Sequence, residues 1–245
     1  MRTALVSDVH GNAVALEAVL ADLDREPVDQ VVALGDMAQG GPQPAEVVDT
    51  VAALGWPVVL GNADDFLLDP DAGAEEATER QLEARAWSVE RLGPGRLETI
   101  RGFAPTVEAG LGGGHTLLAF HGSPGSYDDF LFPATPEGVF RALLGDARAS
   151  VLAGGHIHLQ FLRRGVGDAV FVNPGSVGLS YDHEQADEEF RADPWAAYAV
   201  IETDGAGRLE VAFRRVPLDP GKLVAAVLES GMPYPEDVAA RWRAR

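Results

Sequence analysis

The first half of the chain alternates between short apolar runs and segments in which apolar residues recur at helical spacing. The runs at 3–7, 30–34 and 56–60 are rich in valine, leucine and alanine, as is typical of buried strands. Between the first two runs, apolar residues repeat every three or four positions: Ala13, Leu16, Val19, Leu20 and Leu23. A second helical pattern covers 45–54. We therefore expect the chain to begin β-α-β-α-β.

Helix-capping residues support these boundaries, and the strand pattern ends near residue 64. Asn12 stands where an N-cap belongs, and Gly55 stands where a C-cap glycine belongs. From about 64 to 105 the strand pattern stops. Residues 75–91 have the pattern of an acidic amphipathic helix. A Gly-Pro-Gly run at 93–95 ends this helix, and another short helix follows. We expect a helical insert here, either an ordinary pair of surface helices or a wall that selects the substrate.

The second half is richer in strands. Strand patterns cover 106–109, 116–120, 150–153, 159–164, 169–172, 197–202 and 209–214, and two closing helices are expected over 220–230 and 235–243. This order of strands and helices matches a fold of two packed mixed β-sheets flanked by helices. We predict a single α+β domain over 1–245 with αββα layers, in which the segment 64–105 is the helical insert.

The composition narrows the range of partners and compartments. The net charge is −19, and a nucleic-acid polymer is not expected because its phosphates require a basic surface. Cysteine is absent, and no apolar run approaches the roughly 20 residues needed to span a bilayer. We also expect no leader peptide before the first strand. We expect a cytoplasmic protein with no membrane partner. Basic residues gather at 241–245, which we interpret as complementing a helix C-terminal dipole, with a binding arm as the alternative.

Side chains that bind metals stand directly after five of the predicted strands. They are Asp8, His10, Asp36, Asn62, His121, His156 and His158. Buried charges cost several kcal/mol unless they are paired or bound to a metal. Oxygen and imidazole ligands without sulfur suit manganese, iron, zinc or nickel. Because these ligands are too many for one tetrahedral ion, we expect two divalent ions that share a bridging carboxylate, as in enzymes of phosphoryl transfer.

The order of these motifs resembles that of the calcineurin-like metallophosphoesterase superfamily, and of its small bacterial members in particular. The resemblance covers nearly the whole chain, from Asp8 to the turn at 173–176 and the strands beyond it. It implies a first ion held by Asp8, His10, Asp36 and His158, and a second held by Asp36, Asn62, His121 and His156. It further implies that a hydroxide between the two ions attacks phosphorus in line with the leaving oxygen. Of the four metals, we expect manganese before iron, zinc or nickel.

One position departs from the superfamily pattern. Many members carry a histidine after the Gly-Asn motif, which protonates the leaving group, and this chain carries Ala63 there, followed by Asp64. Proton donation is typically worth about 10²–10⁴-fold, and poor leaving groups need it most. The departure favours a phosphodiesterase acting on a small phosphorylated molecule. The alternatives are a phosphomonoesterase or nucleotide pyrophosphatase of the same superfamily, and a non-catalytic sensor that retains its metals.

Further residues are expected to serve catalysis or substrate binding. Asn12 and Asp64 are the candidate catalytic residues, with Asn12 able to donate an amide hydrogen to a phosphate as well as to cap a helix. Tyr127 and Phe130 follow His121 and are candidates for stacking on a base or aryl group, with packing at the rim as the alternative. His183 is the best replacement for the missing acid. The segment 37–41 lacks the arginine typical of protein phosphatases and diadenosine tetraphosphatases, which disfavours both.

Overall fold

A first β-sheet of four strands carries the beginning of the chain. The computed structural model describes residues 1–69, 71, 77–186 and 190–243. The strand order is β2-β1-β8-β9, where β1 is Arg2–Val6, β2 is Gln30–Ala33, β8 is Trp195–Thr203 and β9 is Leu209–Pro217. The strands β1 and β2 are parallel, whereas β8 is antiparallel to both of its neighbours. The first two predicted strands therefore pair directly, and the chain returns to them near its end.

A second sheet of five strands packs against the first. Its order is β3-β4-β5-β7-β6, formed by β3 (Val107–Gly112), β4 (His115–Ala119), β5 (Val151–Ala153), β6 (Gln160–Arg164) and β7 (Val170–Pro174). The central strands β4, β5 and β7 run parallel, so their carboxyl ends meet at one edge. Ligand-bearing loops after β4 and β5 leave from that edge.

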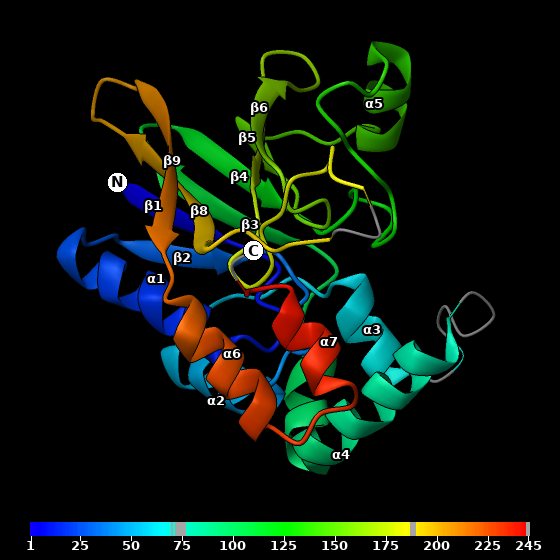
Figure 1. Ribbon diagram of the computed structural model, residues 1–245. Helices are drawn as coiled ribbons and strands as arrows, with labels where there is room; N and C mark the ends of the chain where they lie inside the picture. Colours follow the sequence, from blue (N-terminus) through cyan, green and yellow to red (C-terminus); the bar gives the residue numbers. More distant parts are fainter. Residues whose placement is uncertain (70, 72–76, 187–189, 244–245) are drawn as a thin grey trace.

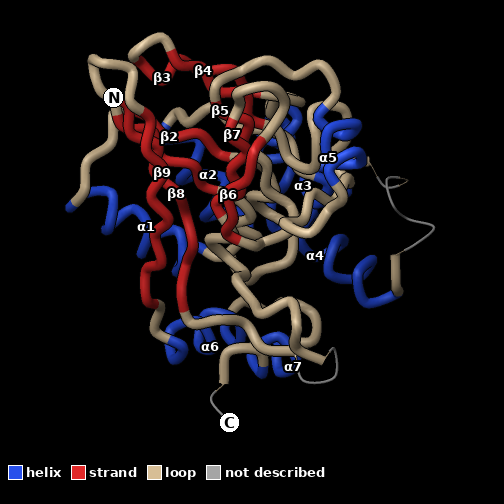
Figure 2. Tube along the Cα trace, turned by 90° about the horizontal axis from the view of Figure 1, so that it is seen from above, coloured by secondary structure: helices blue, strands red, loops and turns tan. Residues whose placement is uncertain are grey.

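Seven helices surround the described sheets. They are α1 (Ala13–Arg25), α2 (Pro44–Leu54), α3 (Asn62–Leu68), α4 (Glu79–Arg101), α5 (Glu137–Leu144), α6 (Pro220–Glu229) and α7 (Pro235–Ala240). Figure 1 shows α6, α7 and α4 grouped on one side of the molecule, and Figure 2 shows β8 and β9 running from the other strands down toward α6. No helix of the described residues combines the length and apolar character needed to cross a membrane.

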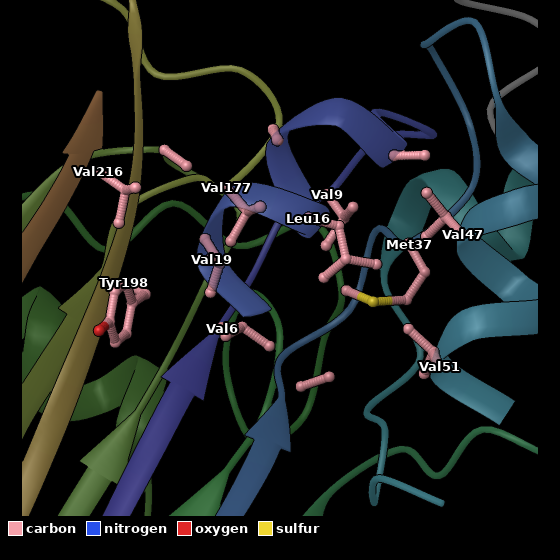
Figure 3. Close-up of a cluster of buried hydrophobic side chains, with 14 of the residues drawn as sticks. Val6, Val9, Leu16, Val19, Met37, Val47, Val51, Val177, Tyr198 and Val216 are labelled. Carbon is pink, nitrogen blue, oxygen red and sulfur yellow. The ribbon is translucent and has the colours of Figure 1, made fainter. Parts of the chain in front are cut away.

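Alternation along the strands builds the layers. In β1, Ala4 and Val6 face α1 and join a cluster with Leu16 and Val19, whereas Leu5 faces the second sheet. Figure 3 shows part of the α1 cluster, to which β8 contributes Tyr198 from the same face of the sheet. A further cluster packs α5 on the outer face of the second sheet. The layers confirm the predicted αββα architecture.

The structure corrects several predicted elements. The predicted strand at 56–60 contributes only two isolated bridges, from Val58 to Ala33 and from Val59 to Ala104. The helices α3 and α5 were not expected. The break at Gly93 was expected, and its left-handed φ of 63° interrupts α4 there. Residues 75–76 of the helix predicted over 75–91 lie outside the described residues, and the last predicted helix ends at Ala240 rather than 243.

Candidate metal centre

The predicted ligands stand in a backbone conformation that non-glycine residues rarely adopt. Five of them have a left-handed φ between 49° and 69°: Asp8, His10, Asp36, His156 and His158. Among the other described non-glycine residues, only Tyr234 shares this conformation. Each such residue costs on the order of 1–3 kcal/mol and persists only where its surroundings determine it. The left-handed turns swing each ligand out of its strand, toward one centre.

Main-chain contacts lock the ligand loops to one another. The Asp8 amide donates to the Gly35 carbonyl at 3.0 Å, and the Gly178 amide donates to the Asp8 carbonyl at 2.9 Å. A Cβ on Gly178 would lie 1.8 Å from the Val9 oxygen, and one on Gly61 would lie 2.1 Å from Asp36 Oδ1. Only glycine fits where backbones approach this closely. The sequence alone gives no sign of this role for Gly178, although the residue lies just after the expected turn at 173–176.

Carbonyl groups orient three of the imidazoles. The Nδ1 atoms of His10, His121 and His158 lie 2.8, 2.7 and 2.7 Å from the carbonyl oxygens of Gln39, Leu34 and Leu179. A carbonyl only accepts, so each Nδ1 carries the hydrogen and donates it. In the neutral imidazoles, Nε2 then presents a lone pair to the centre. This is how outer partners fix the tautomer of a metal-binding histidine.

Asp8, His10 and His158 form the first group of converging atoms. The Nε2 atoms of His10 and His158 are 3.0 Å apart, and Asp8 Oδ1 lies 3.3 Å from His158 Nε2 and 3.9 Å from His10 Nε2. Asp8 Oδ1 is buried and has no hydrogen-bond partner. Two lone pairs facing each other beside a carboxylate repel unless a cation lies between them. The group therefore fits a divalent ion.

Asp36, Asn62, His121 and His156 form the second group. His121 Nε2 lies 3.0 Å from Asn62 Oδ1 and 3.4 Å from Asp36 Oδ2. The buried Nε2 of His156 has no hydrogen-bond partner. Asp36 Oδ2 also lies 3.7 Å from His10 Nε2 of the first group. Asp36 thus stands between the two groups, as a bridging carboxylate must.

The carboxylates create a demand for positive charge in the centre. Burial lowers the pKa of His121, but the Asp36 carboxylate outweighs burial and raises that pKa to about 10. Burial raises the pKa of Asp36, yet the imidazoles of His121 and His10 hold it well below its ordinary value. Asp8 and His158 shift each other's pKa in the same two directions, again against burial. A divalent ion supplies the charge that protons on the imidazoles would otherwise supply.

Asn12 and Asp64 make structural hydrogen bonds beside the centre. Asn12 Oδ1 accepts from the Ala15 amide at 3.0 Å, which confirms the predicted cap, and Nδ2 donates to the Gly178 carbonyl at 3.0 Å. The fully buried Asp64 accepts from the main-chain amides of residues 37, 38 and 61 at 3.0–3.4 Å. Burial and the Asp36 carboxylate raise the pKa of Asp64 to about 7. Catalytic roles for both residues stay predictions.

A cleft of about 1040 Å³ opens beside the centre. Its lining includes His10, Asn62 and His156 of the two groups, together with Ala63 at the position of the missing histidine. Phe130 also lines it, with 56% of its surface exposed and its ring centroid 4.5 Å from that of His156. Ala63 therefore faces the cleft beside the two ligand groups.

The other predicted substrate contacts lie at the margin of the centre. Tyr127 is half-buried and stands outside the lining of this cleft. His183 is exposed, with its ring 4.4 Å from that of Tyr181, which in turn lies 5.6 Å from the ring of His158. The exposed Phe132 stacks on Phe130 at 5.9 Å, in partial agreement with rim packing. Roles of Tyr127 and His183 in substrate binding stay predictions.

Comparison with known proteins relates the chain to one superfamily. Residues 1–190 match the calcineurin-like phosphoesterase superfamily domain. An uncharacterized protein of Methanocaldococcus jannaschii is 26% identical over 195 residues, which cover 73% of this chain and 77% of that protein. A shorter match, 43% identical over 76 residues, links 30% of this chain to 27% of the symmetrical bis(5'-nucleosyl)-tetraphosphatase of Pectobacterium carotovorum.

Solved structures agree with the sequence match. A metallophosphoesterase from Sphaerobacter thermophilus is 26% identical and superposes with a TM-score of 0.74, covering 99% of this chain and 98% of its own. A hypothetical protein from Pyrococcus horikoshii, 21% identical, shares the fold with a TM-score of 0.77 over 97% of this chain and 96% of its own. With the superfamily domain spanning residues 1–190 and this fold around the two ligand groups, the chain belongs to the calcineurin-like phosphoesterase superfamily.

Proposed function

We propose that the chain is a metal-dependent phosphodiesterase that hydrolyses a small phosphorylated molecule. The observation that carries the proposal is the convergence of unpaired acceptor atoms in two groups on either side of Asp36. Such a pair of sites, shared through one carboxylate, suits in-line displacement at phosphorus. Membership of a phosphoesterase superfamily supports the same reaction class.

The residues present fit two divalent ions. Asp8, His10, Asp36 and His158 would hold one ion, and Asp36, Asn62, His121 and His156 would hold the other. Their oxygen and nitrogen atoms suit manganese first, and iron, zinc or nickel as well. When bound, the ions would lower the pKa of water between them and neutralise charge on the phosphate oxygens.

Residues around the cleft define how a substrate would be held. One amide hydrogen of Asn12 donates to Gly178, which leaves the second for a phosphate oxygen. Phe130 offers an exposed ring next to His156 for an aryl or base group. Ala63 offers no proton to the leaving oxygen, so the leaving group must be stable as an anion. That requirement favours activated diesters over alkyl monoesters.

Two other functions compete with a phosphodiesterase. The short match to a bis(5'-nucleosyl)-tetraphosphatase favours a nucleotide pyrophosphatase, whose phosphate leaving group also needs little protonation. A sensor that binds metals without turnover is the non-catalytic alternative, and the complete ligand set argues against it. As partners we propose small phosphorylated molecules rather than nucleic-acid polymers. We also propose a cytoplasmic location.

The experiment that tests this function is turnover of bis-p-nitrophenyl phosphate. We expect hydrolysis that requires added Mn²⁺, stops with EDTA and exceeds the rate with p-nitrophenyl phosphate. Asp36→Asn keeps the shape of the bridging residue while removing its charge, and serves as the matched inactive control. Manganese binding without turnover of either ester or of a dinucleoside polyphosphate would establish the sensor instead.

A further inference from the structure

The cleft extends from the metal centre to a second end that carries positive charge. Helices α4, α6 and α7 line this end, and Figure 1 shows α7 beside both α6 and α4. Arg80 and Arg241 are the two cationic residues of the lining. Apolar side chains occupy the wall around them, among them Leu223, Val227 and Val238. The cleft therefore joins a metal centre, an apolar wall and a pair of guanidinium groups.

Both arginines lie near the carboxylate of Asp237. Arg80 makes an ion pair with Asp237, and its guanidinium lies 4.0 Å from the centroid of the Tyr234 ring. Arg241 makes no ion pair with any residue that the structure describes, and its guanidinium lies 5.6 Å from the centroid of Phe190. Burial, followed by the nearby Arg80 charge, lowers the pKa of Arg241, although Asp237 opposes the shift. Arg241 is thus the guanidinium of this pair that has no carboxylate partner among the described residues.

The backbone holds Arg241 in place. Its carbonyl accepts a hydrogen bond from the Ala192 amide at 3.0 Å. The next residue, Trp242, is 8% exposed and belongs to the main core cluster. Arg241 is half-buried between these anchors, whereas Arg243 is exposed and pairs with Glu236. An anchored main chain reduces the freedom that the Arg241 side chain would lose on binding an anion.

The two arginines distinguish this end of the cleft from an otherwise acidic protein. The chain carries 38 acidic and 19 basic residues, and the lining near the metal centre includes Asp65 and Asp128. A second anionic group of a substrate would be repelled near those aspartates and attracted to the arginines. The planar guanidinium matches phosphate and carboxylate oxygens in a bidentate manner.

We propose that Arg241, with Arg80 beside it, binds a terminal anionic group of the substrate while the scissile phosphodiester lies at the metal centre. The proposal rests on the proposed phosphodiesterase function and narrows its substrate class. The substrate is a phosphodiester whose second arm has an apolar part followed by a phosphate or carboxylate. The basic end of the chain, interpreted from sequence as a complement to a helix dipole, then supplies specificity.

Kinetics on matched diesters test the specificity. The substrates share a p-nitrophenyl leaving group and carry alkyl arms of equal length that end in methyl, carboxylate or phosphonate. In the wild type we expect an anionic terminus to lower KM about tenfold, and the two anions to show which one the site prefers. Arg241→Met should remove this advantage. Arg243→Met, the matched control on the exposed arginine, should retain it.

Calorimetry provides a readout that needs no turnover. With Mn²⁺ present, wild-type protein is titrated with alkane α,ω-bisphosphonates of increasing length and with the corresponding monophosphonates. We expect the bisphosphonates to bind about tenfold tighter above a minimum length, and this gain to vanish in Arg241→Met. Equal affinities of the two series in the wild type overturn the proposal whether or not the variant folds. A bisphosphonate gain without diester turnover would refute the proposed function and leave the anion site standing.

Discussion

The two ends of the cleft are built in different ways. At the metal end, buried ligands occupy left-handed backbone positions, and neighbouring loops touch backbone to backbone. At the arginine end, exposed side chains from separate helices meet, as in the ion pair of Arg80 with Asp237 and the hydrogen bond of Tyr234 to Glu83. The contrast teaches that close backbone packing holds the metal end, whereas contacts between side chains build the arginine end.

The two ends should therefore fail differently on mutation. Substitutions at the metal end should change metal content, turnover and stability together, because ligands and backbone depend on one another. Substitutions at the helical end should change KM and leave metal content intact, because exposed ion pairs contribute little to stability. The following predictions test this division, beginning with the largest effect.

Asp36→Ala should reduce turnover to background and cost both metal ions. The carboxylate lies between the two groups, 3.7 Å from His10 Nε2 and 3.4 Å from His121 Nε2, and no other side chain replaces it. Elemental analysis of the purified variant measures the loss. Two ions at full occupancy would refute the bridging assignment.

His158→Ala should weaken one ion much more than the other. His158 belongs with Asp8 and His10, so the group around His121 keeps its ligands. We expect roughly half of the wild-type metal content and turnover reduced by at least about 10²-fold. His156→Ala should spare the opposite ion, and spectroscopic Co²⁺ titration of both variants distinguishes the two sites. Identical titrations would contradict the division into two groups.

Gly178→Ala should destabilise the fold although it removes no ligand. The added methyl would lie 1.8 Å from the Val9 oxygen, so the loop of Gly178 must move away from the loop that carries Asp8 and His10. We expect a loss of about 3 kcal/mol in the free energy of unfolding, the upper end of usual overpacking costs. Gly125→Ala is the control, since no atom lies within 4 Å of its added methyl. Equal denaturant midpoints for the two variants would contradict the close packing.

Ala63→His should raise monoesterase activity relative to diesterase activity. The new imidazole would face the cleft beside the leaving oxygen, where proton donation is worth at most about 10²–10⁴-fold. Nearby metal ions depress its pKa and favour the neutral form, so we expect a gain near tenfold that grows toward lower pH. An unchanged ratio in a folded variant with both metals would refute the role assigned to Ala63.

In the wild type, rates should fall steeply as the leaving-group pKa of aryl diesters rises.

Phe130→Leu should produce the smallest effect. Loss of an aromatic contact is worth about 0.5–1.5 kcal/mol, which corresponds to a roughly two- to tenfold rise in KM for aryl diesters. Alkyl diesters should be less affected, and metal content should stay at two ions. Phe213→Leu changes a similarly exposed ring on β9 and should alter neither KM. A fall in metal content would show that Phe130 supports His156 rather than the substrate.

The sequence predicts most of the architecture because its strands and helices have clear periods. The helix after Asn12 and the C-cap at Gly55 are present as expected, since local hydrogen bonds determine both. The strand expected at 56–60 stays short because its main chain bonds to Ala33 on one side and to Ala104 on the other, through single bridges at Val58 and Val59. Pairing of that kind depends on the edge of a distant sheet, which a local pattern does not encode.

The candidate ligands could be predicted for a different reason. Burying polar residues directly after strands costs free energy unless they are paired or bind a metal together. Their order along the chain therefore indicates a metal site. The close approach of Gly178 to Val9 has no local signal, because it joins residues 169 positions apart in the sequence. The same holds for Arg241, whose place in the cleft follows from the anchoring of Trp242 in the core.

The most direct test of the central claim is anomalous diffraction at the manganese edge from crystals soaked in Mn²⁺. The account predicts two peaks about 3.5–4 Å apart, with a carboxylate oxygen of Asp36 between them. Asp8, His10 and His158 should surround one peak, and Asn62, His121 and His156 should surround the other. A single peak, or two peaks of which neither contacts Asp36, would contradict the account.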